Sequence, residues 1–255
     1  MPPEICDDIP IRFLSVWNVL KTTQQPIRYK GRCIPEVPRY CIERFSKEGD
    51  LVLDAFMGSG TCVSQCIELN RRVIGLDVSR RAIRITQERL KRFYPNHQED
   101  PLILRATTQK LPIKDESVDL IFAHIPYWSV ITYTTPEDQN KWDLSRVWKL
   151  SKFHKEMDKA YAELYRVLKW DKYACVLVGD VRQGGRKIPL GFITLNRLLN
   201  AGFSFFDIIV KVTDNAISMR RPIVIEKAIS NNRTITMHEY IIIVQKSHKI
   251  NDLGV

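Results

Sequence analysis

The stretch "LVLDAFMGSGTCV" (residues 51–63) decides the fold, because an apolar run passes directly into a glycine-rich turn and then into a helical pattern. Glycines at 58 and 60 let the backbone pass close to a ligand, and the helix start presents unpaired N–H groups. A plain tight turn would give the same pattern. Asp77 favours a ligand, since it ends the next apolar run, "RRVIGLDV" (71–78), where a carboxylate can accept both hydroxyls of a ribose.

The same stretch argues against a nicotinamide dinucleotide as the ligand. The dinucleotide fingerprint requires three glycines, and Val63 occupies the place of the third. A nicotinamide dinucleotide is therefore disfavoured as the ligand of this turn.

Apolar runs and helical patterns alternate along the rest of the chain. Strands are expected at 50–56, 71–78, 102–107, 118–125, 173–181, 203–212 and 238–246, and helices at 59–70, 79–93, 152–169 and 189–201, with a further helix over 39–45. This alternation predicts an α/β fold with a mostly parallel seven-stranded sheet and helices on both faces. No helical pattern separates the last two strands, so one of them is expected to run antiparallel at an edge.

Composition limits the classes of partner and compartment. The chain has 255 residues, long enough for one sizeable core, and we expect one domain over 1–255. A net charge of +10 favours a polyanionic partner. The six cysteines form no CxxC pair, so neither a metal site nor a disulfide framework is expected, and a reduced, cytoplasmic setting fits best. The chain shows no signal-peptide pattern and no apolar run of membrane-spanning length. Oligomeric state is left open.

"DAFMGSGT" (54–61) resembles the D-P-F-x-G-S-G-T signature of the amino-methylating DNA methyltransferases, with only Ala55 departing from it. The resemblance implies a Rossmann-like class I methyltransferase fold and S-adenosylmethionine as cofactor. It also implies that Asp77 binds the ribose of the cofactor. The residues that it places around the methionine and adenosine parts are Asp54, Phe56, Gly58, Gly60 and Thr61.

Two further segments are assigned to the cofactor by the same resemblance. The N-terminal segment (1–49) contains "YKGRCIPEVPRYCIERF", similar to the family segment that closes over the methionine end, although Tyr29 and Lys30 replace its usual His and Pro. Thr107 and Thr108 stand where the family has a contact near the adenine. Asp115 and Asp119, nearby, are expected to be turn and strand-edge residues.

"LIFAHIPYWSV" (120–130) resembles the Pro-Pro-Tyr-Trp corner of the same family, where the preceding position carries Asp, Asn or Ser. An exocyclic amino nitrogen is a poor nucleophile, and acceptors on its two hydrogens aim its lone pair at the methyl group. By the resemblance, His124 replaces the side-chain acceptor, the Ile125 carbonyl supplies the second, Pro126 fixes the turn, and Tyr127 stacks on a flipped base.

His124 carries two open alternatives. A neutral imidazole has one acceptor nitrogen and can replace the usual acceptor if a neighbour holds its tautomer. Alternatively, a buried histidine at a strand end is structural, and the corner has lost activity. Tyr127 and Trp128 also have a structural alternative, in which their side chains simply pack in the core. Trp128 matches the residue that often follows in cytosine-N4 enzymes, which favours cytosine N4 over adenine N6. Cytosine-C5 chemistry is excluded, because no cysteine follows a proline.

Two segments are predicted to hold nucleic acid at the sheet edge where the pocket lies: 128–151 and 213–237. Basic side chains there and in "GDVRQGGRKIPL" (179–190) would contact phosphates without reading sequence. With Trp128, the predicted nucleic-acid contacts are Arg182, Arg186, Lys187, Arg220, Arg221, Lys227 and Arg233.

Three functions stay open. The first is a site-specific DNA amino-methyltransferase of the restriction-modification kind. The second is a related RNA guanine-N2 methyltransferase. The third is a noncatalytic nucleic-acid-binding subunit that keeps the fold.

Overall fold

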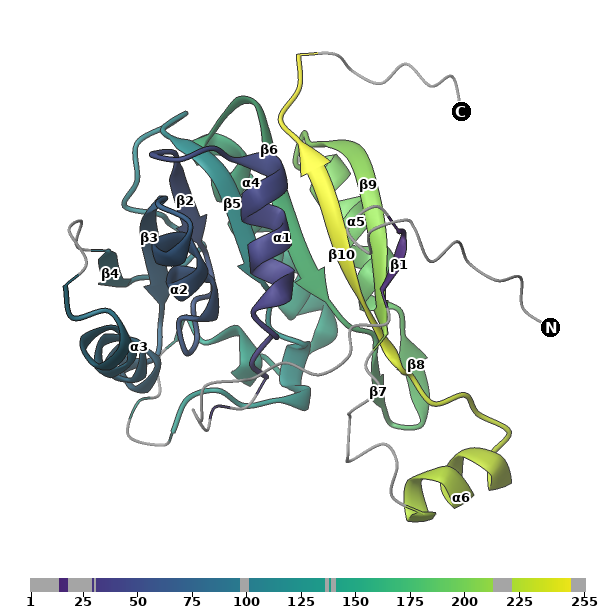
Figure 1. Ribbon diagram of the computed structural model, residues 1–255. Coiled ribbons are helices and arrows are strands. Elements are labelled where there is room, and N and C mark those ends of the chain that lie inside the picture. The colour runs from purple at the N-terminus through teal and green to yellow at the C-terminus, as the bar shows by residue number, and fades with distance from the viewer. Residues whose placement is uncertain are drawn as a thin grey trace.

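The computed structural model describes residues 14–17, 29, 31–96, 101–135, 138, 141–212 and 222–248. Its centre is an eight-stranded sheet in the order β1-β9-β10-β6-β5-β2-β3-β4 (Figure 1). The strands are β1 (Val16–Trp17), β2 (Leu51–Asp54), β3 (Arg72–Asp77), β4 (Leu102–Arg105), β5 (Val118–His124), β6 (Leu168–Val178), β9 (Ser204–Val212) and β10 (His238–Gln245). The predicted α/β fold with a mostly parallel sheet is confirmed.

Alternate residues of the central strands enter two apolar layers, because successive side chains of a strand point to opposite faces. Leu53 and Ile121 join the layer under α4 (Leu150–Val167) and α5 (Leu190–Asn200). Val52 and Leu120 join the layer under α1 (Glu36–Phe45) and α2 (Thr61–Glu68), which α3 (Arg80–Phe93) flanks. Strands buried on both faces explain why the sequence shows continuous apolar runs there.

The place of the antiparallel strand differs from the prediction. β10 is antiparallel, but it lies between β6 and β9 and pairs with both, so it is interior. The two-residue β1, parallel to β9, forms the edge and makes an eighth strand. Periodicity detects strands but does not give their order, and so the edge assignment was wrong.

Three other predictions about helices and strands need correction. α4 ends at Val167 and β6 begins at once with Leu168, so the predicted helix runs two residues too far and the strand starts earlier. A hairpin of β7 (Val181–Gln183) and β8 (Arg186–Ile188) replaces an expected loop. α6 (Pro222–Ser230) lies between β9 and β10, where no helix was expected. Figure 1 shows α6 and this hairpin projecting from one end of the sheet.

No helix in the described ranges combines the length and apolar character that a membrane crossing requires. The expectation that residues 1–255 form one domain stays a prediction.

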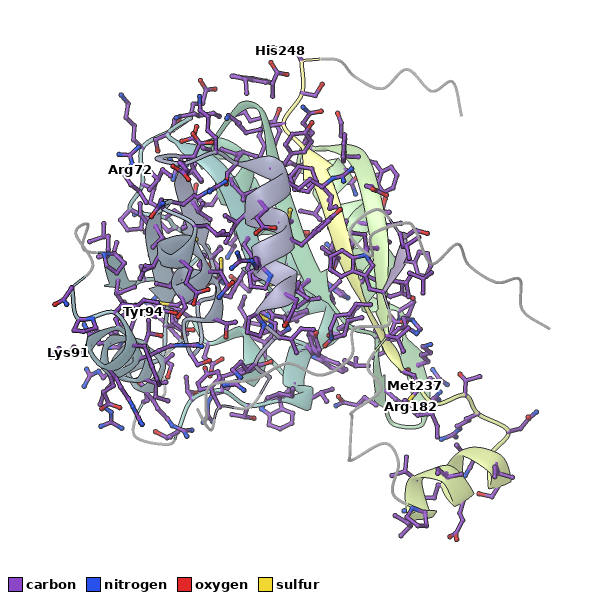
Figure 2. All side chains as sticks on the ribbon, viewed as in Figure 1. Arg72, Lys91, Tyr94, Arg182, Met237 and His248 are labelled. Carbon is purple, nitrogen blue, oxygen red and sulfur yellow. The ribbon has the colours of Figure 1, made fainter. Side chains whose placement is uncertain are left out.

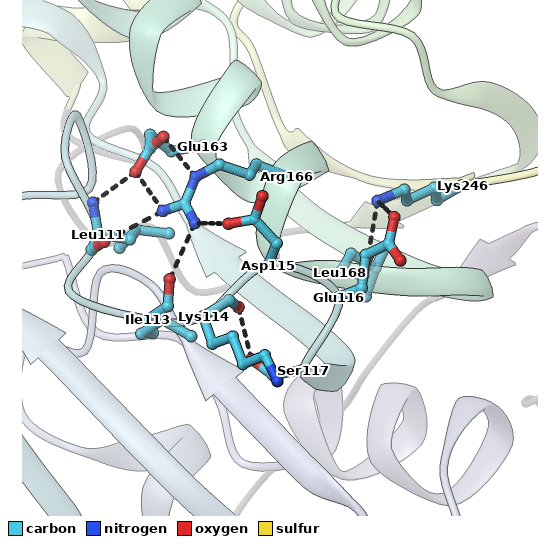
Figure 3. Close-up of polar contacts among 10 residues, drawn as sticks. All are labelled: Leu111, Ile113, Lys114, Asp115, Glu116, Ser117, Glu163, Arg166, Leu168 and Lys246. Carbon is cyan, nitrogen blue, oxygen red and sulfur yellow. Dashed lines mark hydrogen bonds and ion pairs between the residues drawn. The ribbon is translucent and has the colours of Figure 1, made fainter.

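Arg166, near the end of α4, fastens the chain that leads into β5 (Figure 3). Its guanidinium donates to the carbonyls of Leu111 (3.1 Å) and Ile113 (2.9 Å). The same group binds the carboxylates of Glu163 and Asp115. Asp119, at the start of β5, accepts from the backbone N–H of Leu51 and binds Lys169. Asp115 and Asp119 are therefore turn and strand-edge residues, as predicted.

Replacing Arg166 by alanine should lower the free energy of unfolding by about 2 kcal/mol, because two backbone carbonyls and Glu163 lose a charged donor together. Urea denaturation followed by circular dichroism measures the change. Arg84→Ala is the control, since Arg84 makes an exposed pair with Glu88 at 3.9 Å and should change stability by less than about 0.5 kcal/mol. Equal effects of the two substitutions would contradict the role given to Arg166.

Candidate active site

A pocket opens where the parallel strands β2, β3, β4 and β5 end, the edge at which open α/β sheets bind ligands. Most of the cofactor residues predicted from the sequence line it, together with His124 and Pro126. The predicted residues on its wall are Asp54, Phe56, Gly58, Thr61, Asp77, Thr107 and Thr108. Gly60 is not among the lining residues and lies directly before α2.

The glycine-rich turn has the backbone that the sequence predicts. Gly58 and Gly60 have φ values of 54° and 72°, in the region that glycine adopts without strain. A Cβ at Gly60 would lie 2.6 Å from Thr86 Cγ2, so a side chain there would push α3 away. Buried Arg89 donates to the carbonyl of Ser59 at 3.0 Å and holds the turn from the same side. The turn is thus a rigid cradle at the start of α2.

Asp77 joins the turn to the end of β3. Its two carboxylate oxygens accept from the backbone N–H of Gly58 (2.9 Å) and of Ser79 (2.8 Å). Burial raises the pKa of Asp77 to about 6, against the lowering effect of these two hydrogen bonds. The carboxylate is ionised at neutral pH and fixed in place, as an acceptor for ribose hydroxyls must be.

Asp54, at the end of β2, is almost fully buried beside the turn. Burial, with the charge of Asp77 adding to it, raises the pKa of Asp54 from 3.8 to about 8. A pKa of about 8 favours the protonated form at pH 7, and a cation bound beside the carboxyl would favour its ionised form. A buried carboxyl with a raised pKa on a pocket wall is a mark of a functional site.

Binding of a cationic ligand such as S-adenosylmethionine should tighten as the pH rises from about 6 to about 9, because the cation favours ionised Asp54. Without ligand, the same group should lower stability as pH rises from 3.8 to about 8, since the folded chain then holds the proton that the unfolded chain has lost. Titration calorimetry in buffers of different ionisation enthalpy measures the proton released. Asp54→Asn should bind with a flatter pH profile; an unchanged profile would refute the assignment.

The N-terminal segment lies over the turn where it is described. Tyr29, Arg32 and Cys33 line the pocket, and a Cβ at Gly58 would lie 3.1 Å from the ring of Tyr29. Lys30 falls outside the described residues. Of the two threonines, Thr108 donates to the carbonyl of Ala55 at 2.7 Å and is buried, which ties the segment after β4 to the turn.

The predicted catalytic corner begins at His124, the last residue of β5. His124 lies on the pocket wall, and its Nε2 lies 3.0 Å from the hydroxyl of Tyr127. Ile125 is buried and donates its backbone N–H to Leu177 of β6 at 3.3 Å, which fixes the turn into Pro126. Tyr127 is partly buried, and its hydroxyl donates to Glu239 at 2.8 Å. The structure thus gives Tyr127 a contact with His124 that the sequence did not suggest; its stacking role stays a prediction.

Trp128 is placed differently from the prediction. Its ring is 6% exposed, and its indole N–H donates to the carbonyl of Val147 at 2.7 Å. The core-packing alternative therefore describes this side chain, and it is not a surface contact for nucleic acid. Its φ of 51° turns the chain away from the strand end.

Four of the predicted basic contacts lie in or beside the hairpin: Arg182, Arg186, Lys187 and Arg233. Arg182 donates to the carbonyls of Gly185 and Thr234, and Arg233 approaches Gly185 from the segment after α6. Figure 2 shows Arg182 beside the chain that leads into β10. Arg186 and Lys187 are exposed on β8, and Lys227 is exposed on α6. Arg220 and Arg221 lie outside the described residues.

Sequence reasoning missed residues on two parts of the site. Tyr133, Trp142 and Asp143, within 128–151, line the pocket, and Asp143 accepts from the backbone N–H of Ser145 at 2.9 Å. The richness of this segment in Trp and Thr was its signal. Glu239 on β10, which accepts from Tyr127, and Lys211 on β9, which donates to Glu239, had none. The described residues form no cluster of three metal-ligating side chains.

Comparisons with known proteins agree with this geometry. A family described as DNA methylase matches residues 11–88 and 118–253, more than half of the chain. A general methyltransferase-domain family matches residues 52–140.

Individual relatives match over shorter stretches. The Type II methyltransferase M.MjaII of Methanocaldococcus jannaschii is 38% identical over 65 residues, 26% of this chain and 12% of that protein. A tRNA (guanine(10)-N2)-dimethyltransferase of Methanothermobacter thermautotrophicus is 30% identical over 113 residues, 44% of this chain and 32% of that protein. The chain thus spans less than a third of the length of either relative.

The fold has solved counterparts. The SAM-dependent methyltransferase from Methanosarcina mazei superimposes with a TM-score of 0.54 at 17% identity, covering 82% of this chain and 97% of that one. S-adenosylmethionine, the cofactor of methyltransferases of this fold, fits the pocket, because the glycine cradle admits a close ligand, Asp77 offers ribose acceptors, and buried Asp54 suits a cation.

Proposed function

The chain belongs to the DNA methylase family, and we propose that it transfers a methyl group from S-adenosylmethionine to an exocyclic amino group of a base in DNA. The main support for this proposal is that the glycine-rich turn and His124 line the same pocket. A cofactor held by the cradle would thus lie beside the catalytic corner, as direct transfer requires.

The chain's residues divide the work as follows. The cofactor supplies an electrophilic methyl group on a sulfonium. His124 and the Ile125 carbonyl would accept hydrogen bonds from the two amino hydrogens, so that the nitrogen lone pair points at the methyl carbon. As the new N–C bond forms, the C–S bond breaks, and the amino group then loses one proton. Because burial lowers the pKa of His124 to about 4, a proton that the ring accepted from the amino group would pass on to solvent at neutral pH.

Within this chemistry, we propose cytosine N4 as the target over adenine N6. The support comes from the sequence: Trp128 follows Tyr127, as in many cytosine-N4 enzymes. The buried Trp128 side chain itself is not assigned a contact with the base. The exposed Arg182, Arg186 and Arg233, near the hairpin, suit a phosphate backbone.

RNA is the second candidate substrate, since the relative from Methanothermobacter thermautotrophicus methylates a tRNA guanine by its name. Methyl transfer from tritiated S-adenosylmethionine to separate DNA and RNA pools, followed by nucleoside analysis, tests both. N4-methylcytosine in DNA is expected. N2-methylguanine in RNA would establish the second candidate, and no transfer to either pool, despite cofactor binding, would indicate a noncatalytic binding subunit.

A further inference from the structure

His124 can accept a hydrogen bond in the pocket only if its ring carries its proton on the other nitrogen. A neutral imidazole has one N–H donor and one acceptor nitrogen, and its neighbours decide which is which. Nε2 of His124 lies 3.0 Å from the hydroxyl oxygen of Tyr127. Whether Nε2 donates or accepts in this contact therefore sets the tautomer of His124.

The hydroxyl of Tyr127 has a single hydrogen, and Glu239 takes it. Glu239 Oε1 lies 2.8 Å from the hydroxyl oxygen, and a carboxylate only accepts. The oxygen of Tyr127 must then accept from His124, so Nε2 is the protonated nitrogen. Nδ1 is left as the acceptor of a ring that lies on the pocket wall.

Lys211 keeps Glu239 ionised. Its Nζ lies 2.6 Å from Glu239 Oε2, and the two residues are direct partners across β9 and β10. Burial acts to raise the pKa of Glu239, but the charge of Lys211 and the hydrogen bonds from Lys211 and Tyr127 act to lower it, and the pKa lies below its usual value. Burial and the charge of Glu239 raise the pKa of Tyr127 well above its usual value, so its hydroxyl keeps its hydrogen.

The topology brings these four side chains to one edge. β10 runs opposite to its neighbours, so its start lies beside the ends of β6 and β9, and β5, which is parallel to β6, ends at the same edge. A Cβ at Gly179, just after β6, would lie 3.2 Å from the ring of Tyr127 and 3.4 Å from Glu239 Cγ. Glycine there lets Tyr127 and Glu239 meet across the end of β6.

Stability alone is a weak reason for this arrangement. Lys211 is 6% exposed, and desolvating an ion pair offsets much of its attraction. An apolar pair at these facing strand positions would serve packing equally well. In contrast, the donations from His124 to Tyr127 and from Tyr127 to Glu239, with Lys211 donating to Glu239 from the other side, fix a proton at one atom.

We propose that Lys211, Glu239 and Tyr127 are positioning residues that hold His124 as the Nε2–H tautomer, so that Nδ1 accepts one hydrogen of the target amino group. The second half of this statement rests on the proposed function. The first half concerns the protein without substrate, and can be tested separately.

Nitrogen-15 NMR of the histidine rings at pH 7 tests the tautomer directly. His124 should show a protonated Nε2 and an unprotonated Nδ1, with its signals assigned by their loss in His124→Asn. Burial lowers the pKa of this histidine to about 4, so the ring is neutral in this measurement. A protonated Nδ1 in the unaltered protein would overturn the proposal.

Tyr127→Phe removes the acceptor for Nε2–H and should bring the Nδ1–H tautomer into the spectrum. Methyl transfer should fall by roughly 10-fold to 100-fold with unchanged cofactor affinity, since one aligned contact in the transition state is lost. Glu239→Gln should shift the tautomer in the same direction. Wild-type rates in a Tyr127→Phe protein whose tautomer has changed would overturn the proposal.

The chain offers a matched control in a second histidine-tyrosine pair. His238 Nε2 lies 2.8 Å from the hydroxyl of Tyr240 on β10, and neither residue lines the pocket. Tyr240→Phe should leave both the His124 signals and methyl transfer unchanged. If the unaltered protein transfers no methyl group, the proposed function fails, while the tautomer spectrum still decides the role of Tyr127 and Glu239.

Discussion

Replacing Asp77 by alanine should weaken S-adenosylmethionine binding by about 100-fold to 10,000-fold, the effect of losing two charge-assisted hydrogen bonds of about 1.5 to 3 kcal/mol each. The carboxylate is ionised at neutral pH and lines the pocket at the end of β3. Its loss also leaves the backbone N–H groups of Gly58 and Ser79 without their acceptor, so the glycine-rich turn loses its fixed shape. Isothermal titration calorimetry measures the affinity.

Asp119→Ala is the control for Asp77→Ala. Asp119 also accepts from a backbone N–H, that of Leu51, and pairs with Lys169, but it lies at the start of β5, at the opposite end of the sheet from the pocket. The Asp119→Ala substitution should lower the melting temperature and leave cofactor affinity within about twofold, because a change at a distant site is not expected to couple to the pocket. Equal losses of affinity would show that Asp77 acts through stability alone.

The parts of the fold that depend on local pattern were predictable. The turn at 54–61, the strands before and after it, and the helices over 79–93 and 189–201 follow from periodicity and glycine placement, and the structure confirms them. Strand order is different, because it depends on contacts between distant segments. The interior place of β10 is decided by its pairing with both β6 and β9, which no local pattern encodes.

The candidate site divides in the same way. Gly58 and Asp77 were expected at the pocket because each follows or ends a strand, and strand ends share an edge; Asp54 was expected from the family resemblance. All three line the pocket. Glu239 lies 112 residues from Tyr127 and begins a strand that runs the other way, so no spacing rule connects them. Burial of Trp128 was equally hidden, since its partner, Val147, lies across an irregular segment.

Burial shifts the pKa of Asp54 upward and the pKa of His124 downward for the same physical reason. It disfavours the charged form of each group, and so it favours a protonated carboxyl and a neutral imidazole at neutral pH. A bound cationic cofactor would favour the ionised form of Asp54. The state of His124 suits its proposed role at any pH well above 4, because a neutral ring keeps its acceptor nitrogen.

Replacing His124 by alanine and by asparagine should separate the acceptor from the shape of the corner. His124→Ala removes the acceptor and should lower the rate of methyl transfer by about 100-fold to 1,000-fold, the usual effect of deleting one aligned polar group in a transition state. His124→Asn restores an acceptor oxygen, as in the family's own motif, and should retain the rate within about tenfold. Neither should change the affinity for S-adenosylmethionine much, because Asp77 and the glycine turn are untouched. Single-turnover transfer to DNA from tritiated cofactor measures the rate, with calorimetry for the affinity. Full activity in His124→Ala would mean that His124 is structural and that the Ile125 carbonyl suffices as acceptor.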